Sequence, residues 1–124
     1  MDQLRIVRWI GSSRRDLKAM PAEVRLDVGK ALMEAQGGGK SDLAKPLKGF
    51  GGAGILEVVS LHDGDSFRAI YTVRFAEAVY VLHCFQKKSK SGIATPQQEL
   101  NMIRTRLRAA QNAHTEWKKN QDSK

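Results

Sequence analysis

The stretch that most constrains the fold runs from residue 55 to residue 91 and is rich in β-branched and aromatic residues. Asp63-Gly64 divides it, and Asp-Gly between two apolar runs is a strong signal for a two-residue hairpin turn. A second two-residue turn is expected at Glu77-Ala78. The stretch therefore predicts an antiparallel three-strand meander with strands at residues 55–61, 66–74 and 79–87.

The two turns also predict which side chains share a face of this sheet. They place Val59 opposite Arg68, and Arg68 opposite Lys87. Because side chains alternate along a strand, Glu57, Arg68, His83 and Lys87 are expected on one face. The other face is more apolar and is expected to pack on helices; its members are Leu56, Val58, Phe67, Ala69, Tyr71, Val73, Tyr80, Leu82 and Cys84.

The residues before the meander predict one strand and a helical hairpin. Residues 4–10 (LRIVRWI) alternate loosely and favour a strand. Ser12 or Ser13 can cap a first helix that runs through Ala19, and a second helix is expected at about 22–36. Pro21 separates them because the residue before a proline is disfavoured in helical conformation. The second helix has an apolar stripe made of Val24, Val28, Ala31, Leu32 and Ala35.

A loop and a closing helix complete the predicted architecture. Residues 40–54 contain a proline and four glycines, which favour a loop, and they carry Lys45 and Lys48. Thr95-Pro96-Gln97-Gln98 predicts a helix start with Thr95 as N-cap. Leu100, Ile103, Leu107 and Ala110 form the apolar stripe of this helix, and Arg104, Arg106 and Arg108 are expected to face mostly outward.

Size and charge indicate one basic domain. We assign residues 1–117 to the domain and 118–124 to a polar tail. The net charge is +8, from 21 Lys and Arg against 13 Asp and Glu, which is typical of proteins that bind nucleic acid, acidic proteins or anionic membranes. No apolar run has the length of a membrane span and no secretory segment is visible, so a cytoplasmic protein with one reduced cysteine, Cys84, is expected.

The residue types exclude several kinds of site and favour one. The three histidines are scattered, no cysteine pair is present, and no phosphate-loop motif occurs, so neither a metal nor another cofactor is expected. RNA can be cleaved by cations alone, because the attacking group is its own 2′-hydroxyl. Arginine braces phosphate oxygens, and a lysine among other cations can act as a base. The alternative is a basic rim of solvated lysines.

Several segments in order resemble one protein family. These are KPLKG at residues 45–49, LEVV at 56–59, FRAIYTVRF at 67–75, YVLHCFQKKS at 80–89, and the helix from Thr95-Pro96 to Arg106-Leu107. The series resembles the RelE/ParE toxin superfamily, in particular its phage-derived HigB-like branch. The resemblance implies an α+β fold, with an N-terminal strand and helical hairpin packed on the twisted meander and a C-terminal helix.

The resemblance also implies a function: the toxin of a type II toxin–antitoxin system. Such toxins are metal-independent endoribonucleases that cleave messenger RNA, commonly on the ribosome, and a neighbouring antitoxin, often a helix-turn-helix protein, neutralises them. By position, Arg68 matches the phosphate-bracing arginine, and Lys48 or Lys87 the base. Glu57 is read as the partner that orients Arg68. The expected RNA contacts are Lys45, Arg74, His83, Lys88 and Lys90.

The sequence departs from the family at its C-terminus and leaves alternatives open. Family members often carry a base-stacking or proton-transferring group there, where this chain offers only His114 and Trp117, beyond the expected sheet. The alternatives are a ParE-like toxin that inhibits gyrase by binding and cleaves nothing, and an inactive protein that only binds an antitoxin or DNA.

Overall fold

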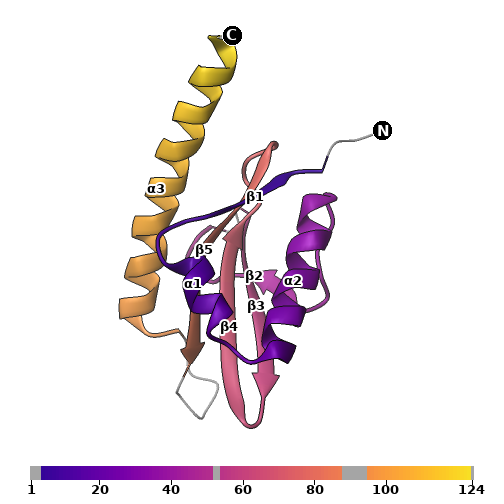
Figure 1. Cartoon of the computed structure of the whole chain (residues 1–124). Helices are drawn as coiled ribbons and strands as arrows, with labels where there is room; N and C mark the ends of the chain where they lie inside the picture. Colours follow the sequence, from indigo (N-terminus) through magenta and orange to yellow (C-terminus); the bar gives the residue numbers. More distant parts are fainter. Residues whose placement is uncertain (1–3, 52–53, 88–94, 124) are drawn as a thin grey trace.

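The computed structural model describes residues 4–51, 54–87 and 95–123. A five-stranded sheet lies between two helical layers (Figure 1). Helices α1 (Ser13–Lys18) and α2 (Ala22–Gln36) cover one face, and α3 (Gln97–Asp122) lies against the other. The structure therefore confirms a mixed α+β architecture in which a helical hairpin and a C-terminal helix pack on a sheet.

The sheet has more strands than the predicted meander. The strand order is β1-β5-β4-β3-β2, with β1 parallel to β5 and the other pairs antiparallel. The strands are β1 (Ile6–Trp9), β2 (Ala44–Pro46), β3 (Ile55–His62), β4 (Asp65–Thr72) and β5 (Ala78–Lys87).

The prediction of a three-strand sheet is therefore wrong at both edges. The N-terminal strand joins the sheet, and β2 forms inside the predicted loop. Strand β2 has only three residues, which are too few to show the alternation of a strand in the sequence. Its last residue is Pro46, which an edge strand tolerates because one of its sides needs no ladder hydrogen bond.

The hairpin between β3 and β4 follows the prediction. Val59 pairs with Arg68, and Glu57 with Ile70. Asp63 and Gly64 have φ angles of 50° and 82°, as a two-residue type I′ turn requires at both positions.

The pairing of β4 with β5 differs from the prediction. Arg68 pairs with Phe85 rather than with Lys87, because five residues, 73–77, connect these strands in place of a two-residue turn. At Arg68 and Ile70, the observed partner on β5 lies two residues before the predicted one. A two-residue shift keeps each side chain on its face, so Arg68 and Lys87 still share a side of the sheet.

A β-bulge at Leu82 interrupts the same pair. Ile70 pairs with His83, but the next residue, Tyr71, pairs with Val81, so Leu82 is additional. Tyr80 and Leu82 therefore pack under α3 and not with α1 and α2, which corrects two members of the predicted apolar face. Because Leu82 is an additional residue, the side chains that follow it on β5 change from one face of the sheet to the other.

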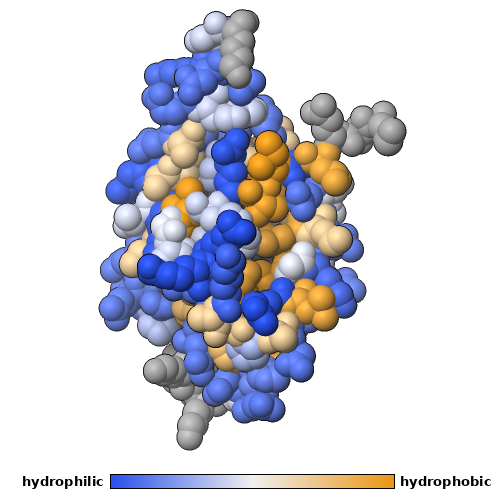
Figure 2. All heavy atoms as spheres, in the orientation of Figure 1, coloured by the Kyte–Doolittle hydropathy of each residue, from blue (hydrophilic) through white to orange (hydrophobic). Residues whose placement is uncertain are grey.

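Two apolar cores result, one on each face. The first lies between the sheet and α1 and α2, where the predicted stripe of α2 is fully buried. The second lies under α3 and includes Ile55, Ile70 and Ile103. Apolar side chains also remain exposed over β1 and α2 (Figure 2), among them Ile6, Leu26 and Met33.

Helix α3 differs from its prediction at both ends. Pro96, not Thr95, is the N-cap, and no side chain caps the helix, so the prediction of Thr95 as N-cap is wrong. The helix continues to Asp122, so residues 118–122 of the predicted tail are helical. No helix in the described part of the chain is both long and apolar enough to cross a membrane.

Candidate functional site

An ion pair fixes the central arginine of the sheet. Nη1 of Arg68 lies 2.9 Å from Oε2 of Glu57, and Nε of Arg68 donates to Oγ of Ser66 at 3.0 Å. The Arg68 side chain is 13% exposed and that of Glu57 is 5% exposed. Bonds at two of its nitrogens hold the plane of the guanidinium, which presents fixed donors to an anion.

Lys87 lies on the same face, two cross-strand pairs along the ladder from Arg68. The residue is only 6% exposed. Burial lowers the pKa of Lys87, and the nearby charges of Arg68 and Lys45 lower it further, while Glu57 acts in the opposite direction. A lysine whose pKa is lowered has a larger neutral fraction and is a better base near neutral pH.

These observations define a cation cluster made of Lys45, Glu57, Arg68 and Lys87. Lys45 is exposed on the edge strand β2, where it lies directly opposite Glu57 in the ladder between β2 and β3. The members come from four adjacent strands and include three cations and one carboxylate. The surplus of positive charge among these four side chains suits a phosphate group.

The other predicted cations are not part of this cluster. Lys48 is exposed in the turn that follows β2, and Arg104 holds this turn against α3 by stacking over Phe50 at 5.0 Å. The side-chain bonds of Arg68 go to Glu57 and Ser66 and do not involve Lys48. Arg74 follows the end of β4. Lys88 and Lys90 lie outside the described residues.

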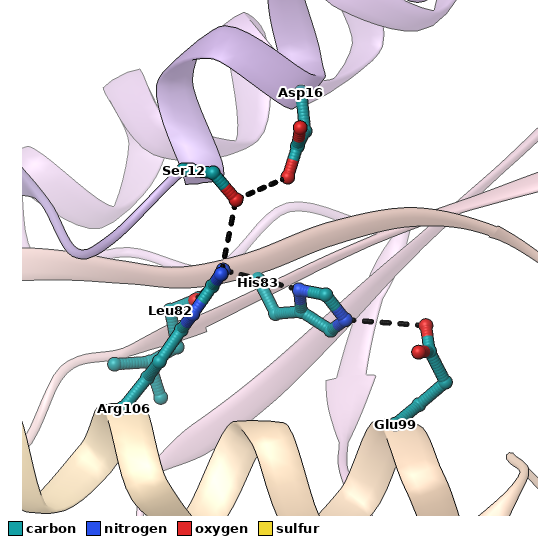
Figure 3. A network of polar contacts seen from close by, with 6 residues as sticks. All are labelled: Ser12, Asp16, Leu82, His83, Glu99 and Arg106. Atoms are coloured by element: carbon teal, nitrogen blue, oxygen red, sulfur yellow. Dashed lines mark hydrogen bonds and ion pairs between the residues drawn. The ribbon is translucent and has the colours of Figure 1, made fainter.

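His83 shares the face of the cation cluster but is engaged within the protein (Figure 3). Arg106 donates from Nη1 to Nδ1 of His83 at 3.2 Å, and Nε2 lies 3.1 Å from Oε2 of Glu99. Because arginine only donates, Nδ1 must accept, and the proton of a neutral ring sits on Nε2. Burial lowers the pKa of His83, and Arg106 also lowers it, while Glu99 raises it.

Arg106 extends this network from α3 to the first helix. Its Nη1 donates to the carbonyl of Leu82 at 3.0 Å, and its Nη2 donates to Oγ of Ser12 at 2.9 Å. Ser12 in turn donates to Asp16 at 2.6 Å. We call Ser12, Asp16, His83, Glu99 and Arg106 the His83 network.

Sequence reasoning missed this network because Arg106 was expected to face outward. The helical spacing carries a usable signal. Arg106 lies three residues after Ile103 and four before Ala110, both of which are fully buried, so it borders the apolar face of α3.

His114 and Trp117 lie away from the cation cluster. Nδ1 of His114 is 3.0 Å from the hydroxyl of Tyr80, and Nε2 is 2.9 Å from Oε1 of Glu77, whose pKa this bond lowers. His114 also stacks on Trp117, with ring centroids 5.5 Å apart. Tyr80 and Lys87 are seven residues apart on β5, about 23 Å at the usual rise of a strand, so these aromatic groups anchor the far part of α3.

Metal-ligand groups and a reactive thiol are two other features through which a site can carry chemistry. No group of His, Cys, Asp or Glu that could hold a metal ion occurs in residues 4–51, 54–87 and 95–123. Cys84 is buried, and burial raises its pKa to about 12. A thiol with so high a pKa is an inert part of the core.

Comparison with known proteins identifies the family. Residues 15–108, well over half of the chain, match the family model described as phage-derived protein Gp49-like (DUF891). No curated protein and no solved structure matches the chain. The matched segment contains the whole cation cluster and all of the His83 network except Ser12. The chain therefore belongs to the phage-derived Gp49-like family, which is a toxin-like family of toxin–antitoxin systems.

Proposed function

We propose that the chain is the toxin of a type II toxin–antitoxin system and acts as a metal-independent endoribonuclease on messenger RNA, in association with the ribosome. The observation that carries the proposal is the cation cluster, in which Glu57 holds Arg68 beside a buried lysine of lowered pKa. Membership of a toxin-like family supports the same class of function and a partner antitoxin.

The cation cluster suits the chemistry of RNA cleavage. The substrate's 2′-hydroxyl attacks the adjacent phosphorus, and the 5′-oxygen leaves with a proton, which yields a 2′,3′-cyclic phosphate and a 5′-hydroxyl. Lys87 in its neutral form takes the proton of the attacking hydroxyl, with Lys48 as the alternative base. Arg68 stabilises the negative charge that develops on the phosphorane.

The remaining cations bind the RNA backbone. Lys45 extends the cluster toward the edge of the sheet, and Lys88 and Lys90 follow Lys87 in the sequence. Arg74 is proposed to contact the backbone at the other end of β4. His83 is held by Glu99 and Arg106, so its proposed contribution to RNA binding is through the shape of the surface rather than through a free ring nitrogen.

The test is induced expression followed by mapping of RNA 5′ ends. The wild-type protein should arrest growth and generate new 5′ ends in messages. Arg68→Ala should abolish both, and Arg68→Lys should also be strongly impaired because lysine keeps the charge but loses the planar fork. Arg25→Ala, which changes an exposed arginine on α2 across the sheet, is the matched control and should behave as wild type.

The alternatives give different results in this experiment. Growth arrest with intact messages and DNA-damage signalling would replace the proposal with gyrase inhibition. Absence of any arrest would replace it with an inactive antitoxin-binding protein. Unfolding of each variant in urea must be followed in parallel, because Arg68→Ala leaves the buried Glu57 unpaired.

A further inference from the structure

The alternation of side chains along β5 reverses at Leu82. Before this residue, Ala78, Tyr80 and Leu82 pack under α3, while Val79 and Val81 pack with α1 and α2. Strict alternation would continue by placing residues 83, 85 and 87 against α1 and α2. The structure shows the opposite, with Phe85 in the core under α3 and Cys84 in the core under α1 and α2.

The bulge is the cause of this reversal, and it determines where Lys87 lies. Leu82 is the residue without a partner on β4, so every later residue of β5 is displaced by one position and changes face. Lys87 consequently pairs with Ser66 on the same face as Arg68. Without the additional residue in the ladder, Lys87 would point to the side of α1 and α2.

Arg106 binds the bulge directly. Its Nη1 donates to the Leu82 carbonyl at 3.0 Å, and its Nη2 bonds to Ser12 at 2.9 Å (Figure 3). The neighbouring carbonyl, that of Val81, accepts from the backbone N–H of Ile10 at 3.0 Å. The bulge is thus held from α3 on one side and from the segment between β1 and α1 on the other.

Gly11 provides the room that this arginine needs. A Cβ atom at this position would lie 2.9 Å from Nε of Arg106, and the φ of Gly11 is +57°, which side chains rarely adopt. The guanidinium therefore lies against bare backbone next to Ser12. The fit indicates that the placement of Arg106 is specific rather than incidental to a basic helix.

We propose that Arg106 is a positioning residue: by binding the carbonyl of Leu82 it fixes the bulge that puts Lys87 on the face of Arg68. Arg106 itself does not touch the RNA. The inference deepens the proposed function and rests on it only for the cleavage readout, because the position of Lys87 can be measured without any activity.

The test compares Arg106→Met with Arg108→Met, an exposed arginine of the same helix. Lysine labelled with ¹³C at Cε gives the pKa of Lys87 by NMR, with Lys87→Met used to assign the signal. Arg106→Met should return this pKa toward its ordinary value because Lys87 leaves its buried position beside Arg68, and burial is the main cause of the lowered pKa, followed by the charge of Arg68. The kcat of RNA cleavage should fall about 100-fold, as expected for a misplaced catalytic group, with KM changed by less than about threefold. Arg108→Met should match wild type in all three measurements.

Arg106→Lys tests the hydrogen bond itself. Lysine retains a donor for the Leu82 carbonyl, so it should recover part of the lowered pKa of Lys87 and part of kcat. A folded Arg106→Met protein in which Lys87 titrates as in wild type overturns the inference, whatever its activity.

Ser12→Ala decides the question if Arg106→Met does not fold. This variant removes the acceptor of Nη2 together with the hydrogen bond from Ser12 to Asp16, and leaves the Arg106 side chain in place. A partial rise of the Lys87 pKa supports the inference, while an unchanged pKa overturns it. A wild-type protein that cleaves no RNA would contradict the proposed function, and the NMR result would still decide the role of Arg106.

Discussion

Glu57 is the one carboxylate of the cation cluster, and replacing it with glutamine tests how the cluster is held together. Glu57→Gln keeps the size of the side chain and removes its charge. The side chain is 5% exposed and lies 2.9 Å from Nη1 of Arg68. After the change, Arg68 remains partly buried beside Lys45 and Lys87 with no negative group among the cluster members.

The expected cost follows from the burial of the pair. Removing one partner of a buried ion pair costs about 3–5 kcal/mol. The amide oxygen of glutamine still accepts a hydrogen bond from Arg68, and the 13% exposure of Arg68 lets water screen part of its charge, so we expect about 2–3 kcal/mol. For a domain of this size, each kcal/mol lowers Tm by about 3–5 °C.

Urea unfolding at neutral pH measures this cost, with Glu116→Gln as control. Glu116 is 71% exposed and lies 3.8 Å from Lys119 on α3, so its replacement should cost about 0–0.5 kcal/mol. Glu57→Gln should also lower the pKa of Lys87 further, since Glu57 now raises it. A Glu57→Gln protein within about 0.5 kcal/mol of wild type would refute the claim that this pair holds Arg68 in place.

Three further outcomes follow from buried groups. Tyr71→Phe should leave stability unchanged or raise it by about 1 kcal/mol in thermal unfolding, because the buried Tyr71 hydroxyl has no partner among the described residues; a clear loss would contradict this. Tyr80→Phe should instead cost about 1–2 kcal/mol by the same assay, since it removes the 3.0 Å bond to His114. Lys87→Met should lose RNA cleavage and gain stability relative to wild type at pH 7. The lowered pKa means that protonated Lys87 is disfavoured in the folded state, so this gain should shrink as pH rises from the lowered folded-state pKa of Lys87 toward 10.5, the ordinary pKa. Urea unfolding at pH 7 and pH 10.5 checks the sign.

The hairpin between β3 and β4 and helix α2 could be predicted because short stretches of sequence determine them. Asp63-Gly64 fixed the hairpin because few residue pairs adopt the two positive φ angles of its turn. The apolar stripe of α2 was equally clear, since a 3.6-residue period persists over four turns. From these alone, Glu57 and Arg68 could be placed on one face in the correct register.

The bulge and the edge strands could not be predicted in this way. The bulge at Leu82 depends on Arg106 and Ile10, which are distant in sequence, and nothing within β5 itself signals it. Lys87 was nevertheless expected on the correct face, because the register error between β4 and β5 was an even number of residues. The predicted face of Lys87 was therefore correct for a different reason from the one in the structure, because the prediction included no bulge.

The charge balance of the site argues for a functional role over a purely structural one. Among the cluster members, one carboxylate faces three cations, and one of these, Lys87, is buried enough that its pKa falls. Burial and the neighbouring cations Arg68 and Lys45 both disfavour the charged form of Lys87. A pKa shifted by burial together with specific neighbouring charges is typical of a functional site, and a phosphodiester bound at Arg68 would add negative charge beside Lys87.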